Sequence, residues 1–354
     1  MAQAFTPRQL TDLLRAEARE LGADHVGFAS AVLPSPSLPG GPQAYEAWVQ
    51  AGHHATMEYM ARDSSTRRDI THWFPAAKSV VLLAFSYAGA PQKADAPHGA
   101  AKIARYALSE DYHDALRGKL RSLQERLREA APEVLGRIFV DTSPVLERLY
   151  ARTAGIGWVG KNTMLLSRRL GSFFLLCGMA LDHELVYDEP TTDHCGSCTR
   201  CLTACPTEAF PKPRTLDASR CIAYLTIEHR GSIPQPLRPG VGDWIFGCDI
   251  CQEVCPWNRF TEPGRVFPAI LPRHVAPEDA AETSPEEFRS RFGNTPVERA
   301  RWRGWVRNAL LVMGNSGDPR YVPVLERFIE HSDPVIAEQA AWSLRQVRQA
   351  SGVL

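Results

Sequence analysis

The chain has 354 residues, of which 44% are hydrophobic and 23% are charged, and its formal net charge at pH 7 is zero. This is the composition of an ordinary globular protein, and at about 150 residues per domain the length predicts two or three domains. A chain without net charge does not bind polyanions indiscriminately, although it can still carry a local basic patch.

Strand and helix patterns alternate over the first half of the chain. Thr6, Pro7 and Gln9 predict the start of a helix, because they supply an N-cap, a first-turn proline and a capping box, and Gly22 predicts its end. The elements that follow are a strand over 25–29, a buried strand over 79–87, a helix over 115–131, a strand over 137–140, a helix from 143 to 155 and a buried strand over 172–181. This alternation predicts an α/β (α+β) domain over residues 1–185.

Eight of the nine cysteines form two runs, Cys195-x2-Cys198-x2-Cys201-x3-Cys205-Pro and Cys248-x2-Cys251-x3-Cys255-Pro, with Cys221 between them. The first run has the spacing that wraps a [4Fe–4S] cluster and sends its fourth cysteine to a second cluster. In the second run the first expected ligand position is Ile245, and Cys221 is the obvious substitute. We therefore predict a ferredoxin-like domain over residues 186–262 that holds two [4Fe–4S] clusters. The predicted ligand sets are Cys195, Cys198, Cys201 and Cys255 for one cluster and Cys205, Cys221, Cys248 and Cys251 for the other.

Other uses of these cysteines fit less well. C-x2-C pairs also bind zinc, but zinc requires neither the three-cysteine run nor the x3-Cys-Pro ending. Disulfides require an oxidising compartment, and the N-terminal sequence has no secretory signal pattern. No apolar stretch approaches the roughly 20 residues that span a bilayer, so we expect a soluble, cytoplasmic protein. Cys177 lies in the apolar stretch 173–181 and is interpreted as a core residue.

The C-terminal part is predicted to be helical. Residues 263–285 are rich in proline and acidic residues and resemble a linker, and the helical domain covers residues 280–354. Asp318-Pro and Asp333-Pro predict the starts of its second and third helices. The stretches 307–311 and 340–344 are similar and lie about 33 residues apart, which favours HEAT-like repeats over an ordinary helical hairpin.

Three features outside the cysteine runs are candidates for chemistry or binding. Asp141 stands where a strand meets a helix, and it can cap that helix, which the pattern favours, or donate a proton if its pKa is raised. The G-x-G-x-x-G match over 155–160 follows a helix rather than a strand, so it indicates a loop near a ligand and not a dinucleotide site. Arginines alternate with tryptophans over 299–307, which fits either RNA contacts or a solvated helix face with core tryptophans.

Several longer motifs point to one family. They are Asp141-Thr-Ser-Pro-Val-Leu-Glu-Arg148, Gly155-Ile-Gly-Trp-Val-Gly-Lys-Asn-Thr163, Cys221-Ile-Ala-Tyr-Leu-Thr226 and Gly247-Cys-Asp-Ile-Cys-Gln-Glu-Val-Cys-Pro-Trp-Asn258. With the double cluster array they resemble the epoxyqueuosine reductases over nearly the whole chain. That family is cobalamin-dependent, is related to reductive dehalogenases, and reduces epoxyqueuosine at the wobble position of tRNA to queuosine. The resemblance implies a cobalamin-binding domain over residues 1–185 and a tRNA-binding HEAT-like domain over residues 280–354.

The resemblance also implies roles for individual residues. Asp141 matches the proton donor of the family. The positions that match its cobalamin-binding residues are Arg105, Asp141, Glu147, Arg148, Lys161, Tyr224 and Thr226, and those expected to meet the tRNA are Arg230, Arg301, Arg303 and Arg307. The common D-x-H-x-x-G corrinoid motif is absent, because Asp111-Tyr-His113 is followed by Leu116 in place of the glycine. We therefore expect cobalamin in its base-off form, without a protein imidazole.

The implied partners are tRNA and an external one-electron reductant of the ferredoxin or flavodoxin type, and we expect a monomer that does not bind a membrane. One alternative is a cobalamin-dependent reductive dehalogenase of a small organohalide. Those enzymes typically carry a twin-arginine leader, whereas Arg67-Arg68 and Arg168-Arg169 are internal. A second alternative is a non-enzymatic ferredoxin-type electron carrier. That function does not explain the large N-terminal domain.

Overall fold

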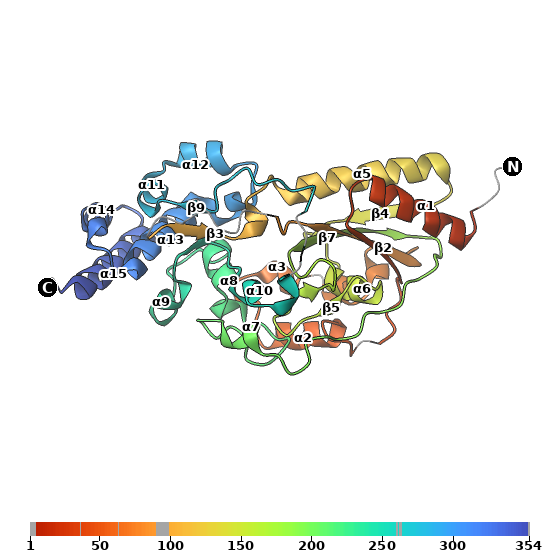
Figure 1. Ribbon diagram of the computed structural model, residues 1–354, viewed down its shortest axis with the longest axis horizontal. Helices are drawn as coiled ribbons and strands as arrows, with labels where there is room; N and C mark the ends of the chain where they lie inside the picture. Colours follow the sequence, from red (N-terminus) through yellow and green to blue (C-terminus); the bar gives the residue numbers. More distant parts are fainter. Residues whose placement is uncertain are drawn as a thin grey trace.

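The computed structural model describes residues 5–352 except residues 36, 63, 90–98, 260, 262 and 263. The molecule is elongated, with the sheet of the N-terminal part towards one end and the C-terminal helices at the other (Figure 1). The segment that carries the cysteine runs lies between them, so it contacts both parts.

The N-terminal part is built on a four-stranded sheet whose strand order is β1-β2-β7-β4. Its strands are β1 (His25–Ser30), β2 (Ser79–Ser86), β4 (Gly136–Phe139) and β7 (Phe174–Leu181). Each neighbouring pair is antiparallel. The prediction of a mixed α and β fold is confirmed, but the rule that ligands bind at the carboxyl ends of parallel strands does not apply to this sheet.

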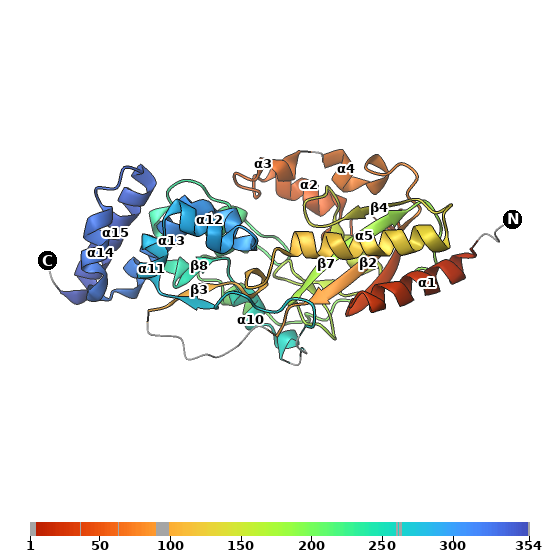
Figure 2. The ribbon, with the colours of Figure 1, turned by 90° about the horizontal axis from the view of Figure 1, so that it is seen from above.

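Helices cover both faces of this sheet. Helices α1 (Pro7–Glu20) and α5 (Tyr112–Ala130) pack on one face and α6 (Glu147–Thr153) packs on the other, while α1 and α5 lie side by side (Figures 1 and 2). Every residue of β2 is buried, and its alternate side chains enter two different cores. The continuous apolar sequence over 79–87 therefore predicted a fully covered strand correctly.

The helix starts were predicted with mixed success. Thr6 and Gln9 form the predicted capping box at the start of α1. The helix expected from residue 143 begins only at Glu147, because the preceding residues form turns, and the prediction of its start was wrong. The chain leaves this helix at Gly155, whose positive φ of 73° is a conformation that glycine adopts without strain.

A second sheet joins three distant parts of the sequence. Its strands β8 (Trp244–Phe246), β3 (Ala101–Ile103) and β9 (His274–Val275) lie in that order. The side chains of Ala101 and Ile103 belong to the same core as the C-terminal helices. Residues 263–285 are therefore not only a linker, since they contribute β9 and helix α11 (Pro277–Glu282), and the linker prediction was wrong there.

The C-terminal part is helical, as predicted. Its helices are α11, α12 (Pro285–Phe292), α13 (Arg301–Ser316), α14 (Val322–Phe328) and α15 (Pro334–Ser351). Helix α13 packs between α11 and α15. Asp333 caps α15 and Asp318 caps the turn before α14, at the two Asp-Pro positions that the sequence indicated. Of the helices in the described ranges, none is long and apolar enough to cross a membrane.

The remaining elements are short. They are α2 (Pro42–Gln50), α3 (Glu58–Ala61), α4 (Ser64–Arg68), β5 (Trp158–Val159), β6 (Leu165–Leu166), α7 (Arg200–Thr203), α8 (Ile222–Ile227), α9 (Arg238–Val241) and α10 (Ile250–Glu253). Helices α2, α3 and α4 gather on the side of the molecule opposite α1 (Figure 2). Because α3 extends towards the C-terminal part, this group forms one edge of the site described next.

Candidate functional site

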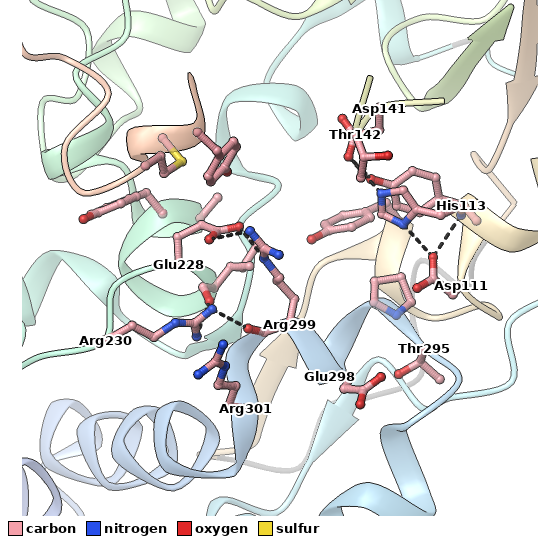
Figure 3. Close-up of a pocket in the computed structure, with 18 of the residues that line it drawn as sticks. Asp111, His113, Asp141, Thr142, Glu228, Arg230, Thr295, Glu298, Arg299 and Arg301 are labelled. Atoms are coloured by element: carbon pink, nitrogen blue, oxygen red, sulfur yellow. Dashed lines mark hydrogen bonds and ion pairs between the residues drawn. The ribbon is translucent and has the colours of Figure 1, made fainter. Parts of the chain in front are cut away.

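A cavity of about 1210 Å³ lies where the N-terminal, cysteine-containing and C-terminal parts meet (Figure 3). Its lining residues come from the α2–α4 region, the start of α5, the turn after β4, helix α8 and the segment before α13. Drug-sized ligands usually occupy about 300–1,000 Å³. The cavity is therefore large enough for more than one small molecule.

One wall carries two carboxylates that share a histidine. Asp111 caps α5 and accepts from the backbone N–H of His113 at 2.9 Å, and its Oδ1 lies 2.7 Å from Nδ1 of the same ring. Nε2 of His113 lies 3.0 Å from Oδ2 of Asp141, and the Tyr112 hydroxyl donates to that oxygen at 2.8 Å. Both nitrogens of the imidazole are thus engaged, and Asp141 receives two hydrogen bonds at the cavity surface.

The proton of this group resides mainly on His113 at neutral pH. Desolvation by burial acts to lower the pKa of His113, but its hydrogen bonds to Asp111 and Asp141 outweigh that and raise it to about 9. For Asp141 desolvation acts to raise the pKa, yet the hydrogen bonds from His113 and Tyr112 hold it below the usual range. The arrangement is a carboxylate–imidazolium–carboxylate series with one end at the cavity.

The turn that presents Asp141 is strained and is held by its neighbours. Asp141 has a φ of 38°, a left-handed conformation that is uncommon outside glycine, and its backbone N–H donates to Oε1 of Glu147 at 2.6 Å. Burial raises the pKa of Glu147 to about 8, with the negative charge of Asp141 acting in the same sense. Arg148 donates to the carbonyl of Thr163. Asp141 does not cap α6, because α6 begins six residues later.

All nine cysteines, each within the described ranges, are free thiols. Burial raises the pKa of Cys201 to about 11, and the neighbouring thiols of Cys195, Cys255 and Cys198 act in the same sense. Burial likewise raises the pKa of Cys251, with Cys221 as its strongest thiol neighbour. Cys201 is also a neighbour of Cys251, so the thiols of both sets lie close to one another and their division into two ligand sets stays a prediction.

The two sets differ in their surroundings. Cys221 lines the large cavity, where it is the residue before α8. Cys198 is exposed, and so are the neighbours on both sides, residues 196–200. Cys177 is fully buried in the core of the N-terminal part, which confirms it as a core residue. One cysteine set therefore faces the cavity and the other reaches the protein surface.

Arginines form the opposite wall. Figure 3 shows Arg230, Arg299 and Arg301 with Glu228 across the cavity from Asp141 and His113. Arg299 pairs with Glu228 through two hydrogen bonds of 2.8 and 3.1 Å. The cavity thus has a carboxylate and imidazole wall on one side and a cationic wall on the other.

Comparison with known proteins agrees with this geometry. The model of the 4Fe-4S double cluster binding domain matches residues 194–258, and the model of epoxyqueuosine reductase QueG, DUF1730, matches residues 67–142. Epoxyqueuosine reductase from Cyclobacterium marinum is 42% identical over 84% of this chain and 95% of its own, and that from Escherichia coli is 36% identical over 98% and 92%. The chain belongs to the epoxyqueuosine reductase family. The cysteine segment accordingly binds two [4Fe–4S] clusters, rather than zinc, and the chain is an oxidoreductase and not a simple electron carrier.

Solved structures agree with this assignment. A crystal structure described as epoxyqueuosine reductase with a tRNA-Tyr epoxyqueuosine-modified stem loop superposes with a TM-score of 0.86 at 30% identity, over 96% of this chain and 90% of that one. The reductase of Streptococcus thermophilus gives a TM-score of 0.83 at 25% identity, over 95% and 90%. The three-part architecture is thus that of epoxyqueuosine reductases.

Some residues expected at the cofactor lie elsewhere in this reductase. Tyr224 and Asp141 line the cavity. Thr226 is buried, and its hydroxyl donates to the Ile222 carbonyl and accepts from the N–H of Gly247, so it is a structural residue. Arg105 is also buried, where it pairs with Glu253.

Lys161 contacts the cluster segment and not the cavity. Its ammonium donates to the carbonyls of Gly196 and Cys198 at 2.7 and 2.9 Å. Neither Lys161 nor Arg105 nor Thr226 is among the residues that line the cavity, so direct cofactor contact by these three stays a prediction.

Burial of Arg307 contradicts the prediction that this residue contacts RNA. Its side chain is only 1% exposed, and its guanidinium donates to the carbonyls of Leu225, His229 and Gly231 at 2.6–2.8 Å. Trp305 is a core residue, as the alternative interpretation of the Arg/Trp stretch expected. Arg303 is ion-paired with Asp333 at 2.7 Å but remains partly exposed.

Sequence reasoning missed the partners of Asp141. The pair Asp111 and His113 was considered only as an incomplete corrinoid motif. The sequence did contain a signal for this pair, namely Asp-x-His at the start of a helix. The aspartate caps the helix there, and the histidine two residues later lies in its first turn. No local pattern could have placed it beside Asp141, because the contact spans 28 positions.

Replacing Arg307 by Met should destabilise the protein without weakening its affinity for RNA. Three carbonyls would lose a buried charged donor, which costs about 3 kcal/mol in the free energy of unfolding. The measurements are anaerobic thermal unfolding and RNA binding at several salt concentrations. The matched control is Arg303→Met, whose partly exposed ion pair should cost about 0–1 kcal/mol. A folded Arg307→Met protein with a reduced salt dependence of RNA binding would contradict the structural role.

Proposed function

We propose that this protein reduces epoxyqueuosine at the wobble position of tRNA to queuosine. The observation that carries the proposal is the convergence on one cavity of a cluster ligand, Cys221, a proton-holding pair, Asp141 and His113, and an arginine wall. Electrons, protons and an anionic polymer are what the reaction of the related reductases requires.

The net reaction fixes what the site must deliver. Reductive opening of the epoxide breaks both carbon–oxygen bonds, forms a carbon–carbon double bond and releases the oxygen as water. It consumes two electrons and two protons. The electrons arrive singly through the clusters, and the protons arrive at the departing oxygen from a group at the cavity wall.

The residues around the cavity fit the cobalamin that the family resemblance implies. Met57, Met60 and Tyr224 line it and offer apolar surface for a flat ring, while Asp141, with Glu147 and Arg148 beside it, offers polar contacts. When bound, cobalamin supplies a low-valent cobalt centre that accepts single electrons and is nucleophilic towards the epoxide.

The state of His113 supports one part of the proposed base-off form, namely that cobalamin binds without a protein imidazole. His113 is the sole histidine among the described residues that line the large cavity, and both of its ring nitrogens are held by carboxylates. An imidazole in that state has no free lone pair for a metal. The protein therefore offers no nitrogen ligand from this wall.

The cluster ligands suggest a direction for electron flow. An external one-electron donor of the ferredoxin or flavodoxin type would dock at the exposed Cys198, two residues before the exposed Arg200. Electrons would leave through the set that includes Cys221, because that cysteine lines the cavity.

Asp141 delivers the proton and His113 stores it. Nε2 of His113 and Oδ2 of Asp141 are hydrogen-bonded, so a proton can move from the imidazolium to the carboxylate. Asp141 then passes this proton to the oxygen of the substrate, and it is a neutral acid only during that transfer. Asp111 holds the ring in position through Nδ1 and stabilises its charge.

The RNA is expected to approach over the C-terminal helices. Arg301 and the partly exposed Arg303 remain the proposed tRNA contacts, whereas the donors of Arg230 are used on backbone carbonyls. A wobble base belongs to a single-stranded loop, so it can enter a cavity without the opening of a duplex. We further propose HEAT-like packing of the C-terminal helices, a monomeric state and a cytoplasmic location, where tRNA is the substrate.

Anaerobic turnover of epoxyqueuosine-containing tRNA, with and without cobalamin, tests the function and the role of Asp141 together. Nucleoside mass spectrometry should detect queuosine only with cobalamin. Asp141→Asn should retain both clusters and bound cobalamin but lose about 10²–10⁴ of the rate, because an amide is not an acid. Full turnover by this variant would remove Asp141 as the acid, and no product from the loaded wild-type protein would reject the substrate.

The rate should fall as the pH rises through about 9, since His113 loses its stored proton there. His113→Gln keeps a hydrogen-bonding side chain but cannot carry the proton, so it should be slower by about 10²-fold and lose this basic limb. The pH profile of kcat/KM separates His113 from Glu147, whose pKa is about 8. An unchanged basic limb in His113→Gln would show that another group holds the proton.

Cys221→Ala tests the ligand sets. The variant should bind about four irons where the parent binds about eight, because one cluster loses a ligand. Iron analysis and electron paramagnetic resonance of the reduced protein give the count, and Cys177→Ala, which removes a core thiol, is the control. Eight irons in Cys221→Ala would exclude Cys221 as a ligand.

A further inference from the structure

A smaller cavity of about 370 Å³ adjoins the large one on the arginine side. Tyr59, Glu228, Arg230, Arg299 and Arg301 line both cavities. The two cavities therefore share a wall that carries Arg230, Arg299 and Arg301 (Figure 3).

The charge of this wall is only partly balanced. Arg299 is neutralised by Glu228. Arg301 is exposed, and among the described residues its guanidinium has no hydrogen-bond or ion-pair partner. Burial lowers the pKa of Arg230; Glu228 opposes this, and the positive charges of Arg301 and Arg299 act with it. The small cavity is thus a cationic recess with one guanidinium free to bind an anion.

The backbone that presents Arg301 is strained. Its φ is 60° and its ψ is 158°, a region that is essentially restricted to glycine. Two neighbouring interactions hold the turn in this state. The guanidinium of Arg230 donates to the carbonyls of Ala300 and Arg299 at 3.0 and 2.8 Å, and the indole N–H of Trp302 donates to the carbonyl of Thr283 at 2.7 Å. Strain maintained in this way is typical of functional sites.

We propose that Arg301 binds a backbone phosphate of the RNA next to the nucleotide in the large cavity, and that Arg230 is a positioning residue that holds the strained turn. A planar guanidinium matches a phosphate with two parallel hydrogen bonds. This proposal rests on the proposed function, because the phosphate bound by Arg301 is assigned to the RNA substrate. Arg230 was expected to contact the RNA directly, whereas this proposal gives it a positioning role, because its guanidinium donates to backbone carbonyls.

The test compares Arg301→Ala with Arg301→Gly. Both remove the guanidinium, so both should bind an anticodon stem-loop RNA roughly tenfold more weakly, because a hydrogen bond to a charged group is lost. The slope of log affinity against log salt should become shallower by about 0.7, the value of one single-strand phosphate contact. Only glycine relieves the strain, so Arg301→Gly should melt about 1–3 °C higher than Arg301→Ala.

Arg345→Ala is the control, since it removes an exposed charge from α15 without touching either cavity. Its affinity and salt slope should equal those of the wild type. Wild-type affinity and slope in both Arg301 variants would overturn the phosphate site, and a lower melting temperature for Arg301→Gly than for Arg301→Ala would overturn the strain. Continued wild-type turnover of epoxyqueuosine RNA in either case would leave the proposed function standing.

Arg230→Met tests the positioning role. If Arg230 acts through the turn, its replacement should weaken RNA binding in the wild type but add little in the Arg301→Ala background. Full additivity of the two losses would mean that Arg230 contacts the RNA itself and would overturn its assignment as a positioning residue.

Discussion

Two neighbouring side chains of α13 hold the cysteine-containing segment against the C-terminal helices. Arg307 donates to carbonyls at the end of α8 and in the loop after it, and Asn308 donates to the carbonyls of Thr226 and Ile245 at 2.9 and 2.8 Å. The last carbonyls of a helix have no partner within it, so buried donors from elsewhere are required. Because Cys221 directly precedes α8 and Tyr224 lies in it, this interaction also places a predicted cluster ligand and Tyr224 at the cavity.

The cavity is consequently assembled from elements that have no local relation in the sequence. Asp141 follows a strand of the first sheet, Cys221 directly precedes α8, and Arg301 starts α13. Its walls carry opposite charge, with carboxylates around an imidazolium on one side and guanidinium groups on the other. A proton-consuming reaction on a base of an anionic polymer requires both, and placing them on opposite walls keeps the cations from neutralising the acid.

The sequence predicted what local physics determines. The capping box of α1, the buried strand β2 and the Asp-Pro starts in the C-terminal part depend on residues a few positions apart. Cluster spacing is likewise a local requirement of cysteine geometry. The antiparallel order of the sheet, the insertion of β3 between β8 and β9, and the burial of Arg307 depend on tertiary packing, and an arginine beside tryptophans looks the same whether it meets RNA or the carbonyls of another segment.

The two strained residues of the site lie on its two walls. Asp141 and Arg301 have φ values of 38° and 60°, and both belong to turns fixed by hydrogen bonds from outside the turn. Such conformations cost about 1–3 kcal/mol each, which the surrounding fold must offset. The Glu147 carboxylate holds the Asp141 turn by accepting from its backbone N–H, and the Arg230 guanidinium holds the Arg301 turn by donating to the carbonyls of Ala300 and Arg299. An arginine that was expected to bind RNA directly, Arg230, therefore serves the site by keeping an unfavourable backbone in place.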